Sequence, residues 1–157
     1  MATDTGGANA QLRELADLAA VVAEFVVAAL AYGHSLFFGG NGGSAAAAQH
    51  LAAEYVVRFR RKRMAIPALA LTTDTSVLTA GGNDFGFATV FARQVEALGR
   101  EGDVFFLHST SGGGLLRGRV ERALVVPTTV NSRAQEIQLA MGHVICELVD
   151  RALADAQ

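Results

Sequence analysis

The sequence contains no tryptophan, two prolines, two tyrosines and one cysteine among its 157 residues. A single cysteine cannot form a disulfide within the chain, which excludes a disulfide-stabilised secreted scaffold and favours a reducing compartment. That residue, Cys146, lies in an apolar stretch, so we interpret it as a small side chain of the core.

The chain also has little net charge. Its formal charge is -2 at pH 7 and its pI is near 6.1, which gives no basic surface for nucleic acid or an anionic membrane. The most apolar stretch, residues 15–33, is interrupted by Asp17 and Glu24 and follows a polar segment. It predicts neither a signal peptide nor a membrane span but a helix that is apolar on more than one face, which indicates oligomer packing. A small soluble ligand is the expected partner.

Glycine, by contrast, is abundant, with 17 residues in a chain that is 51% hydrophobic. This composition suits buried parallel strands joined by tight turns, and the length suits one domain. We predict an α/β fold, a three-layer, doubly wound and mainly parallel sheet, over residues 1–157. A long N-terminal helix is expected at about 8–33, the sheet and its loops at about 34–128, and a C-terminal helix at about 131–153.

An apolar strand followed by a loop of small residues occurs twice. "HSLFF" leads into "GGNGGS" and a helix at about 44–58, and "DVFFLH" leads into "STSG". Between them we expect a strand in "IPALALTT", a short helix capped by Asp74 or Thr75 and broken by "GGN" after Ala80, and an amphipathic helix at 87–99. The ligand site of such a sheet lies beyond the carboxyl ends of its strands.

One part of the chain is too short for this architecture. After "STSG" an α/β unit needs a helix and then a strand before the possible strand "RALVVPT", yet only "GGLLRGRVE" is present, about as many residues as a crossover helix alone requires. Either the chain has lost this unit, or the sequence joins residues across an omitted segment. We favour the second explanation.

The first loop is suited to an anion or a sugar. Its glycines allow backbone N–H groups to point at a ligand from the start of the following helix, and Ser44 can cap that helix and contact the ligand. The loop is not a P-loop, because no Gly-Lys-Ser/Thr follows, and a purely structural turn remains an alternative. The candidate residues are Asn41, Gly42, Gly43 and Ser44.

The second loop offers hydroxyl groups and backbone amides for phosphate oxygens from Ser109, Thr110 and Ser111. A strand-end cap is the simpler alternative for this cluster. Asn83 and Asp84 could hold sugar hydroxyls, with ordinary turn chemistry as an equal alternative. The basic segment 58–63 is either a solvated helix end or contains an arginine that binds phosphate.

Four polar side chains form a candidate metal site. His50 and Glu54 are four residues apart on one predicted helix and share a face. On the last helix, Gln135 and His143 are about 80° apart around the axis and about 12 Å apart along it. Two imidazoles, a carboxylate and an amide oxygen suit zinc. A surface ion pair is the alternative for His50 and Glu54, and His34 and His108 are interpreted as core histidines.

These motifs together resemble one family. "GNGGSAAAAQHLAAEYVVRF", "PALALTTDTSVLTAGGNDFGF", "RQVEALGREGDV", "STSG" and "RAQEIQLAMGHVICELVD" occur in order from about Gly40 to Leu153 and are similar to the sedoheptulose 7-phosphate (phosphoheptose) isomerases of the sugar isomerase (SIS) superfamily. The resemblance implies a single SIS domain, flavodoxin-like, in a cytoplasmic homotetramer whose sites form between subunits. The sequence departs from the family pattern at Gly113 and Gly114, where a further serine is usual.

The resemblance also implies roles for the residues. Glu54 and His143 match the acid/base pair, and His50, Glu54, Gln135 and His143 match the positions that bind one zinc ion per subunit. The remaining matches contact substrate: Asn41, Gly42, Gly43, Ser44, Glu54, Asn83, Asp84, Ser109, Thr110, Ser111 and Gln135. The implied reaction converts sedoheptulose 7-phosphate to D-glycero-D-manno-heptose 7-phosphate through an enediol.

Two other functions are compatible with the glycine loop. One is a non-catalytic SIS tetramer that binds the replication initiator protein, which would not need Glu54 or His143. The other is a phosphosugar-sensing module, which would need a DNA-binding partner domain. The presence of both acid/base residues favours the enzyme.

Overall fold

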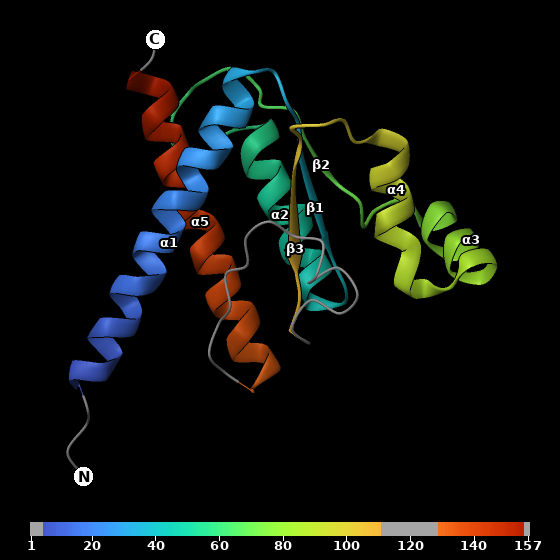
Figure 1. The fold of residues 1–157 in the computed structure, drawn as a ribbon, viewed down its shortest axis with the longest axis horizontal. Coiled ribbons are helices and arrows are strands. Elements are labelled where there is room, and N and C mark those ends of the chain that lie inside the picture. The colour runs from blue at the N-terminus through green and yellow to red at the C-terminus, as the bar shows by residue number, and fades with distance from the viewer. Residues whose placement is uncertain (1–4, 111–128, 156–157) are drawn as a thin grey trace.

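The computed structural model describes residues 5–110 and 129–155 of the chain, which form helices around a small sheet (Figure 1). In chain order the elements are α1 (Thr5–Ala31), β1 (Leu36–Gly40), α2 (Gly43–Val56), β2 (Ala68–Ala70), α3 (Thr75–Phe85), the 3-10 turn η1 (Phe87–Thr89), α4 (Val90–Leu98), β3 (Val104–His108) and α5 (Asn131–Asp155). The predicted strand in residues 122–128 lies outside the described residues, as does Ser111.

The three strands form a parallel sheet in the order β2-β1-β3. Phe38 of β1 pairs with Ala70 on one side and with Phe106 on the other. All five residues of the central strand β1 are buried, as expected for a parallel strand that is covered on both faces. The predicted α/β class, the parallel sheet and the long first helix are confirmed.

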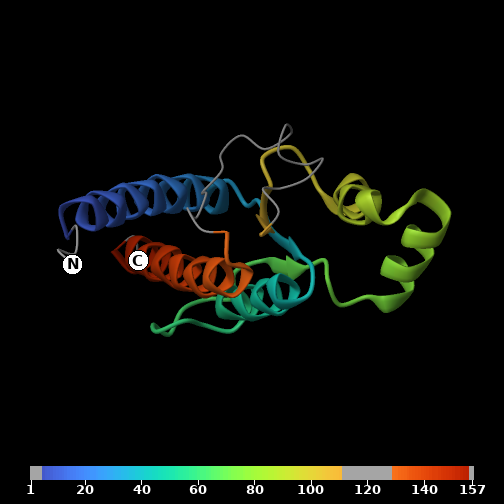
Figure 2. The same cartoon turned by 90° about the horizontal axis from the view of Figure 1, so that it is seen from below.

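The sheet separates two hydrophobic cores (Figure 2). Side chains alternate along a strand, so Leu36 and Phe38 face α1, α2 and α5, whereas Phe37 packs with Val90 and Phe91 of α4. The larger core lies on the α1, α2 and α5 side, where the Phe38 ring stacks on Phe106 with centroids 4.9 Å apart. Helix α4 covers the other face, and α3 packs on α4 and η1 beyond it (Figure 1).

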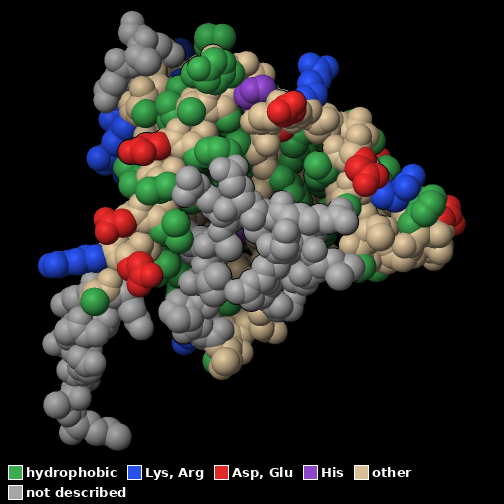
Figure 3. Space-filling view, in the orientation of Figure 1, with side chains coloured by type: hydrophobic (Ala, Val, Ile, Leu, Met, Phe, Trp, Pro, Cys, Tyr) green, Lys and Arg blue, Asp and Glu red, His purple; other side chains and the backbone are tan. Residues whose placement is uncertain are grey.

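Helix α1 buries one stripe and exposes another. Ala19, Ala23 and Val26 are buried against α5, while Val21 and Phe25, four residues apart on the opposite face, remain exposed to 39% each. Figure 3 shows apolar side chains between charged ones over this part of the surface. An apolar second face agrees with the expected oligomer packing. Among the described residues, no helix combines the length and the apolar character needed to cross a bilayer.

The prediction that "GGN" ends the third helix was wrong. Helix α3 continues through Gly81, Gly82 and Asn83 to Phe85 and stops at Gly86, whose φ is 84°. The Asp74 carboxylate accepts a hydrogen bond from Val77 N and caps the start of the helix, as predicted. Two helical glycines cost only about 1 kcal/mol each relative to alanine, which the packing of α3 on α4 and η1 offsets.

The favoured explanation for the short segment after "STSG" was also wrong. The numbering runs through this region without an omitted segment. The segment between "STSG" and α5 is therefore shorter than a helix and a strand of an α/β unit require.

Candidate active site

His50, Glu54 and His143 lie together on facing sides of α2 and α5. The two Nε2 atoms of His50 and His143 are 2.8 Å apart, and His50 Nε2 is 3.4 Å from Glu54 Oε1. The three candidate ligand atoms all lie within 4.8 Å of one another. The predicted sharing of a helix face by His50 and Glu54 is confirmed, and the fold adds His143 from 93 residues away.

The two helices come close because Gly142 has no side chain. A Cβ atom at this position would lie 2.5 Å from Leu51 Cδ1, closer than van der Waals contact allows, and Leu51 itself is 1% exposed. One turn further along, the buried Tyr55 hydroxyl and the Cys146 thiol hydrogen-bond to each other. Burial raises the pKa of Cys146 to about 12, so it is the inert core thiol that was predicted.

The surroundings of His143 favour its neutral form. Partial burial lowers its pKa, and the neighbouring imidazole of His50 lowers it further, while the Glu54 carboxylate opposes both effects. The ring of Phe59 stacks on His143 with centroids 5.4 Å apart. A neutral imidazole accepts a proton or binds a metal ion, so His143 is prepared for either role.

The cluster fits a zinc ion. Zinc takes imidazole nitrogen and carboxylate oxygen in tetrahedral geometry, with bonds of about 2 Å, which puts two ligand atoms on one ion roughly 3.3 Å apart. The 2.8 Å and 3.4 Å separations at His50 Nε2 bracket that spacing. His50, Glu54 and His143 could therefore hold the metal, with one position left for a further ligand.

Gln135, the predicted fourth ligand, lies against the glycine loop. A Cβ atom added to Gly43 would lie 2.6 Å from Gln135 Oε1, so the Gln135 amide occupies the space that a side chain at position 43 would fill. This contact brings Gln135 to the predicted substrate loop. A side chain at position 43 would displace the Gln135 amide from this place.

The glycine loop differs from the prediction in its cap. The N-cap of α2 is Gly42, with φ at 56°, and no side chain caps the helix. Ser44 is 3% exposed and lies inside the first turn instead, and Ser44 O would be 2.7 Å from a Cβ at Gly40. The N–H groups of Ser44 and Ala45 donate to Asn41 O and Gly42 O at 3.0 Å and 3.1 Å, so the first turn bonds to the loop itself, and Asn41 and Gly42 are exposed.

The end of β3 lies beside α5. Gln138 Nε2 donates a hydrogen bond of 2.8 Å to the Ser109 carbonyl. Within the described residues, buried Gln138 Oε1 and His108 Nε2 have no hydrogen-bond partner, and burial lowers the pKa of His108 to about 4. Ser109 and Thr110 follow the strand as predicted, and Gln138 is a neighbour that the sequence did not single out.

Asn83 and Asp84 are not brought to the cluster. Both are exposed at the end of α3, which lies on the opposite side of the sheet from α5 (Figures 1 and 2). Within one chain these two residues are separate from His50, Glu54 and His143.

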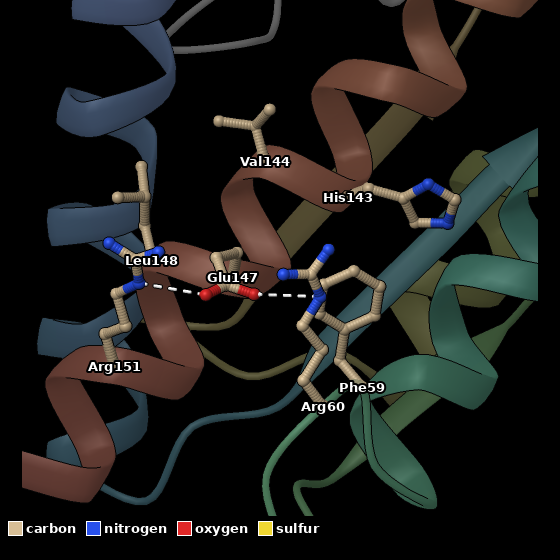
Figure 4. Close-up of a pocket in the computed structure, with 7 residues that line it drawn as sticks. All are labelled: Phe59, Arg60, His143, Val144, Glu147, Leu148 and Arg151. Carbon is tan, nitrogen blue, oxygen red and sulfur yellow. Dashed lines mark hydrogen bonds and ion pairs between the residues drawn. The ribbon is translucent and has the colours of Figure 1, made fainter.

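A cavity of about 320 Å³ adjoins the cluster on the side away from the sheet. His143 and Phe59 line it, and Glu147 lies between Arg60 and Arg151 at its wall (Figure 4). The Glu147 carboxylate is 3.3 Å from Arg60 Nε and 2.9 Å from Arg151 Nε. Because two guanidinium groups share one carboxylate, this wall of the cavity keeps a net positive charge.

Sequence reasoning missed the partner of Arg63. This last residue of the basic segment is buried and pairs with Asp150 of α5, with Nε 2.6 Å from Oδ1. Its partner lies 87 residues further along the chain, so no local pattern could have identified the pair. The segment is neither a wholly solvated helix end nor, at Arg63, a phosphate site.

Comparison with known proteins agrees with this geometry. Residues 8–114 match the SIS domain family. The phosphoheptose isomerase of Roseiflexus sp. (strain RS-1) is 46% identical over 88% of this chain and 83% of its own length, and that of Geobacter sulfurreducens is 45% identical over 90% and 88%. The solved structure of the phosphoheptose isomerase from Neisseria gonorrhoeae superposes with a TM-score of 0.72 at 33% identity, covering 95% of this chain and all of that one.

These comparisons also bear on the short segment that follows "STSG". The Roseiflexus match spans 164 aligned positions but only 88% of this chain's 157 residues, about 138, so about 26 positions of the match have no residue here. That number suits a helix and a strand. The SIS domain match ends at Gly114, where the sequence analysis located the shortening. From its fold, its cluster and its relatives, the chain belongs to the phosphoheptose isomerases of the SIS domain family.

Proposed function

We propose that this protein interconverts sedoheptulose 7-phosphate and D-glycero-D-manno-heptose 7-phosphate by proton transfer through an enediol. The observation that carries the proposal is the juxtaposition of a carboxylate and a neutral imidazole, Glu54 and His143, on two facing helices next to the glycine loop. Its relatives named phosphoheptose isomerase support the same reaction.

Isomerisation of a ketose to an aldose requires a proton to leave one carbon and another to reach its neighbour, while the two oxygens exchange protons. In the proposed mechanism Glu54 takes the proton from carbon, which gives the enediol. His143, neutral because burial and His50 lower its pKa, makes the complementary transfer. Two positioned groups are sufficient for these proton transfers, because binding holds the substrate in the reactive orientation.

The loops hold the substrate in this proposal. Ser109, Thr110 and Ser111 bind the phosphate, whose binding energy fixes the reacting end of the sugar. Backbone groups of Gly42 and Gly43 contact the sugar chain, as do the side chains of Asn41, Ser44 and Gln135. Asn83 and Asp84 would contact sugar hydroxyls of a site in a neighbouring subunit, because their own chain holds them away from its cluster.

Zinc is the proposed cofactor, one ion per subunit, held by His50, Glu54 and His143 with Gln135 as a fourth ligand. A bound zinc ion polarises the oxygen atoms that exchange protons. We also propose a cytoplasmic homotetramer, for which the exposed apolar face of α1 at Val21 and Phe25 provides contact surface.

Turnover tests the proposal directly. The purified protein, loaded with zinc, is incubated with sedoheptulose 7-phosphate and the aldose is measured, for the native chain and for Glu54→Gln and His143→Ala. Loss of a general acid or base typically costs a factor of 10² to 10⁴, so each variant is expected to lose at least about 100-fold in kcat.

The matched control is Glu96→Gln, which removes an exposed carboxylate on α4 and is expected to leave turnover unchanged. Full turnover in Glu54→Gln or His143→Ala would contradict the role given to that residue. A native chain that folds, binds zinc and forms no aldose would contradict the proposed reaction and favour a non-catalytic SIS protein.

A further inference from the structure

The last turn of α2 is held by a buried arginine from outside the helix. The final carbonyl groups of an α-helix have no partner within it. Arg63 donates from its two terminal nitrogens to two of these groups, to Tyr55 O at 2.8 Å and to Glu54 O at 2.8 Å. The backbone of Glu54, the residue proposed to remove the proton from carbon, is therefore fixed by a guanidinium group.

The same guanidinium is fixed in turn by α5. Its Nε lies 2.6 Å from Asp150 Oδ1, and the side chains of Arg63 and Asp150 are 6% and 2% exposed. Asp150 Oδ2 also accepts hydrogen bonds from the backbone N–H groups of Arg60 and Arg61, at 3.1 Å and 3.3 Å. Burial alone would raise the pKa of Asp150, but these hydrogen bonds from Arg63, Arg60 and Arg61 lower it overall, so the carboxylate stays ionised.

The pair connects the two halves of the proposed acid/base site. Asp150 is on the same helix as His143, two turns further on, and Arg63 holds the turn that carries Glu54. A buried ion pair adds little net stability compared with apolar side chains of the same volume, because desolvation opposes the attraction. A guanidinium fork with fixed geometry is, however, well suited to setting the distance between two elements.

We propose that Arg63 and Asp150 are positioning residues for the isomerisation, and that their ion pair sets the position of Glu54 on α2 relative to His143 on α5. This inference rests on the proposed function. Arg63 contacts the cluster only at the backbone carbonyl of Glu54, and Asp150 acts through Arg63, so neither residue contacts the reacting side chains.

The test measures kcat, KM and melting temperature for Arg63→Lys and Asp150→Asn. Lysine keeps the charge but cannot bind two carbonyl groups and a carboxylate at once, and asparagine keeps the shape but loses the charge. A displacement of about 1 Å at a catalytic group costs up to about 100-fold. We expect kcat to fall about 100-fold in Arg63→Lys and about tenfold in Asp150→Asn, with KM within about twofold of the native value. The double variant should lose no more than Arg63→Lys, because the two residues act as one unit.

Two controls separate positioning from loss of stability. Val26→Ala removes core volume from α1, where Val26 is fully buried, and should lower the melting temperature without lowering kcat. Arg100→Lys makes the same exchange at an exposed arginine and should change neither.

If kcat in Arg63→Lys and Asp150→Asn falls no further than in Val26→Ala, or if the loss is in KM, the inference is wrong. An active native protein with fully active variants would overturn this inference and leave the proposed function standing. An inactive native protein would overturn both.

Discussion

The interface between α2 and α5 and the edge of the sheet at β3 contrast sharply in how well their polar groups are satisfied. Between α2 and α5, Asp150 accepts three hydrogen bonds and Arg63 donates four. At the β3 edge, His108 Nε2 and Gln138 Oε1 are buried without a partner among the described residues. The first region is therefore expected to be rigid, and the second to depend on something that binds there.

The same contrast appears in the sheet. β1 has a strand on each side and all five of its residues are buried. In the described structure β3 pairs with β1 alone, and four of its five residues are only partly buried. The match to the Roseiflexus relative contains about 26 positions that have no residue in this chain. The proposed proton-transfer groups thus lie in the region whose polar groups are paired, and the proposed phosphate loop lies at the β3 edge.

The largest expected effect comes from separating α2 and α5. Gly142→Ala places a methyl group 2.5 Å from Leu51, and such overpacking costs about 1–3 kcal/mol of unfolding free energy. Because the displaced helices carry Glu54 and His143, kcat should also fall by about tenfold or more. Chemical denaturation and turnover assays measure the two effects.

Gly81→Ala is the matched control for this prediction. The added methyl group at this helical position meets Val90 at 3.6 Å, an ordinary contact, and alanine is the better helix former by up to about 1 kcal/mol. This variant should be as stable as the native chain or more so, with unchanged kcat. If Gly142→Ala behaved in the same way, the tight approach of the two helices would have no role.

A smaller effect tests the β3 edge. His108 has a pKa of about 4 in the folded protein because it is buried, against about 6.5 when unfolded. The unfolded chain then binds more protons between these values, so the folded state loses stability as pH falls from about 6.5 toward 4. The native chain should lose about 2 kcal/mol more than His108→Gln between pH 7 and pH 4.5.

Unfolding free energies of both proteins, measured by denaturant titration at the two pH values, decide this prediction. Equal losses in the native chain and in His108→Gln would show that His108 is solvated or paired, and the contrast between the two regions would be weaker than the structure indicates.

Local patterns predicted what depends on neighbouring residues. The apolar run before the glycines gave β1, the four-residue spacing placed His50 and Glu54 on one face, and Asp74 capped α3. What depends on long-range packing was missed. Gly81 to Asn83 stayed helical because α4 and η1 pack on α3, and Arg63 found a partner 87 residues away. Ser44 lost the expected capping role because the chain enters α2 one residue earlier, at Gly43.

The measurement that tests the central claim most directly is isomerisation of sedoheptulose 7-phosphate in deuterated water, with mass and NMR analysis of the aldose. Glu54 and His50 are exposed to 20% and 47%, so the proton that Glu54 takes from C1 exchanges with solvent and the proton delivered to C2 comes from solvent. The native enzyme should incorporate deuterium at C2 of the product, and Glu54→Gln should give neither product nor label. Complete conversion without deuterium at C2 would contradict proton transfer through Glu54.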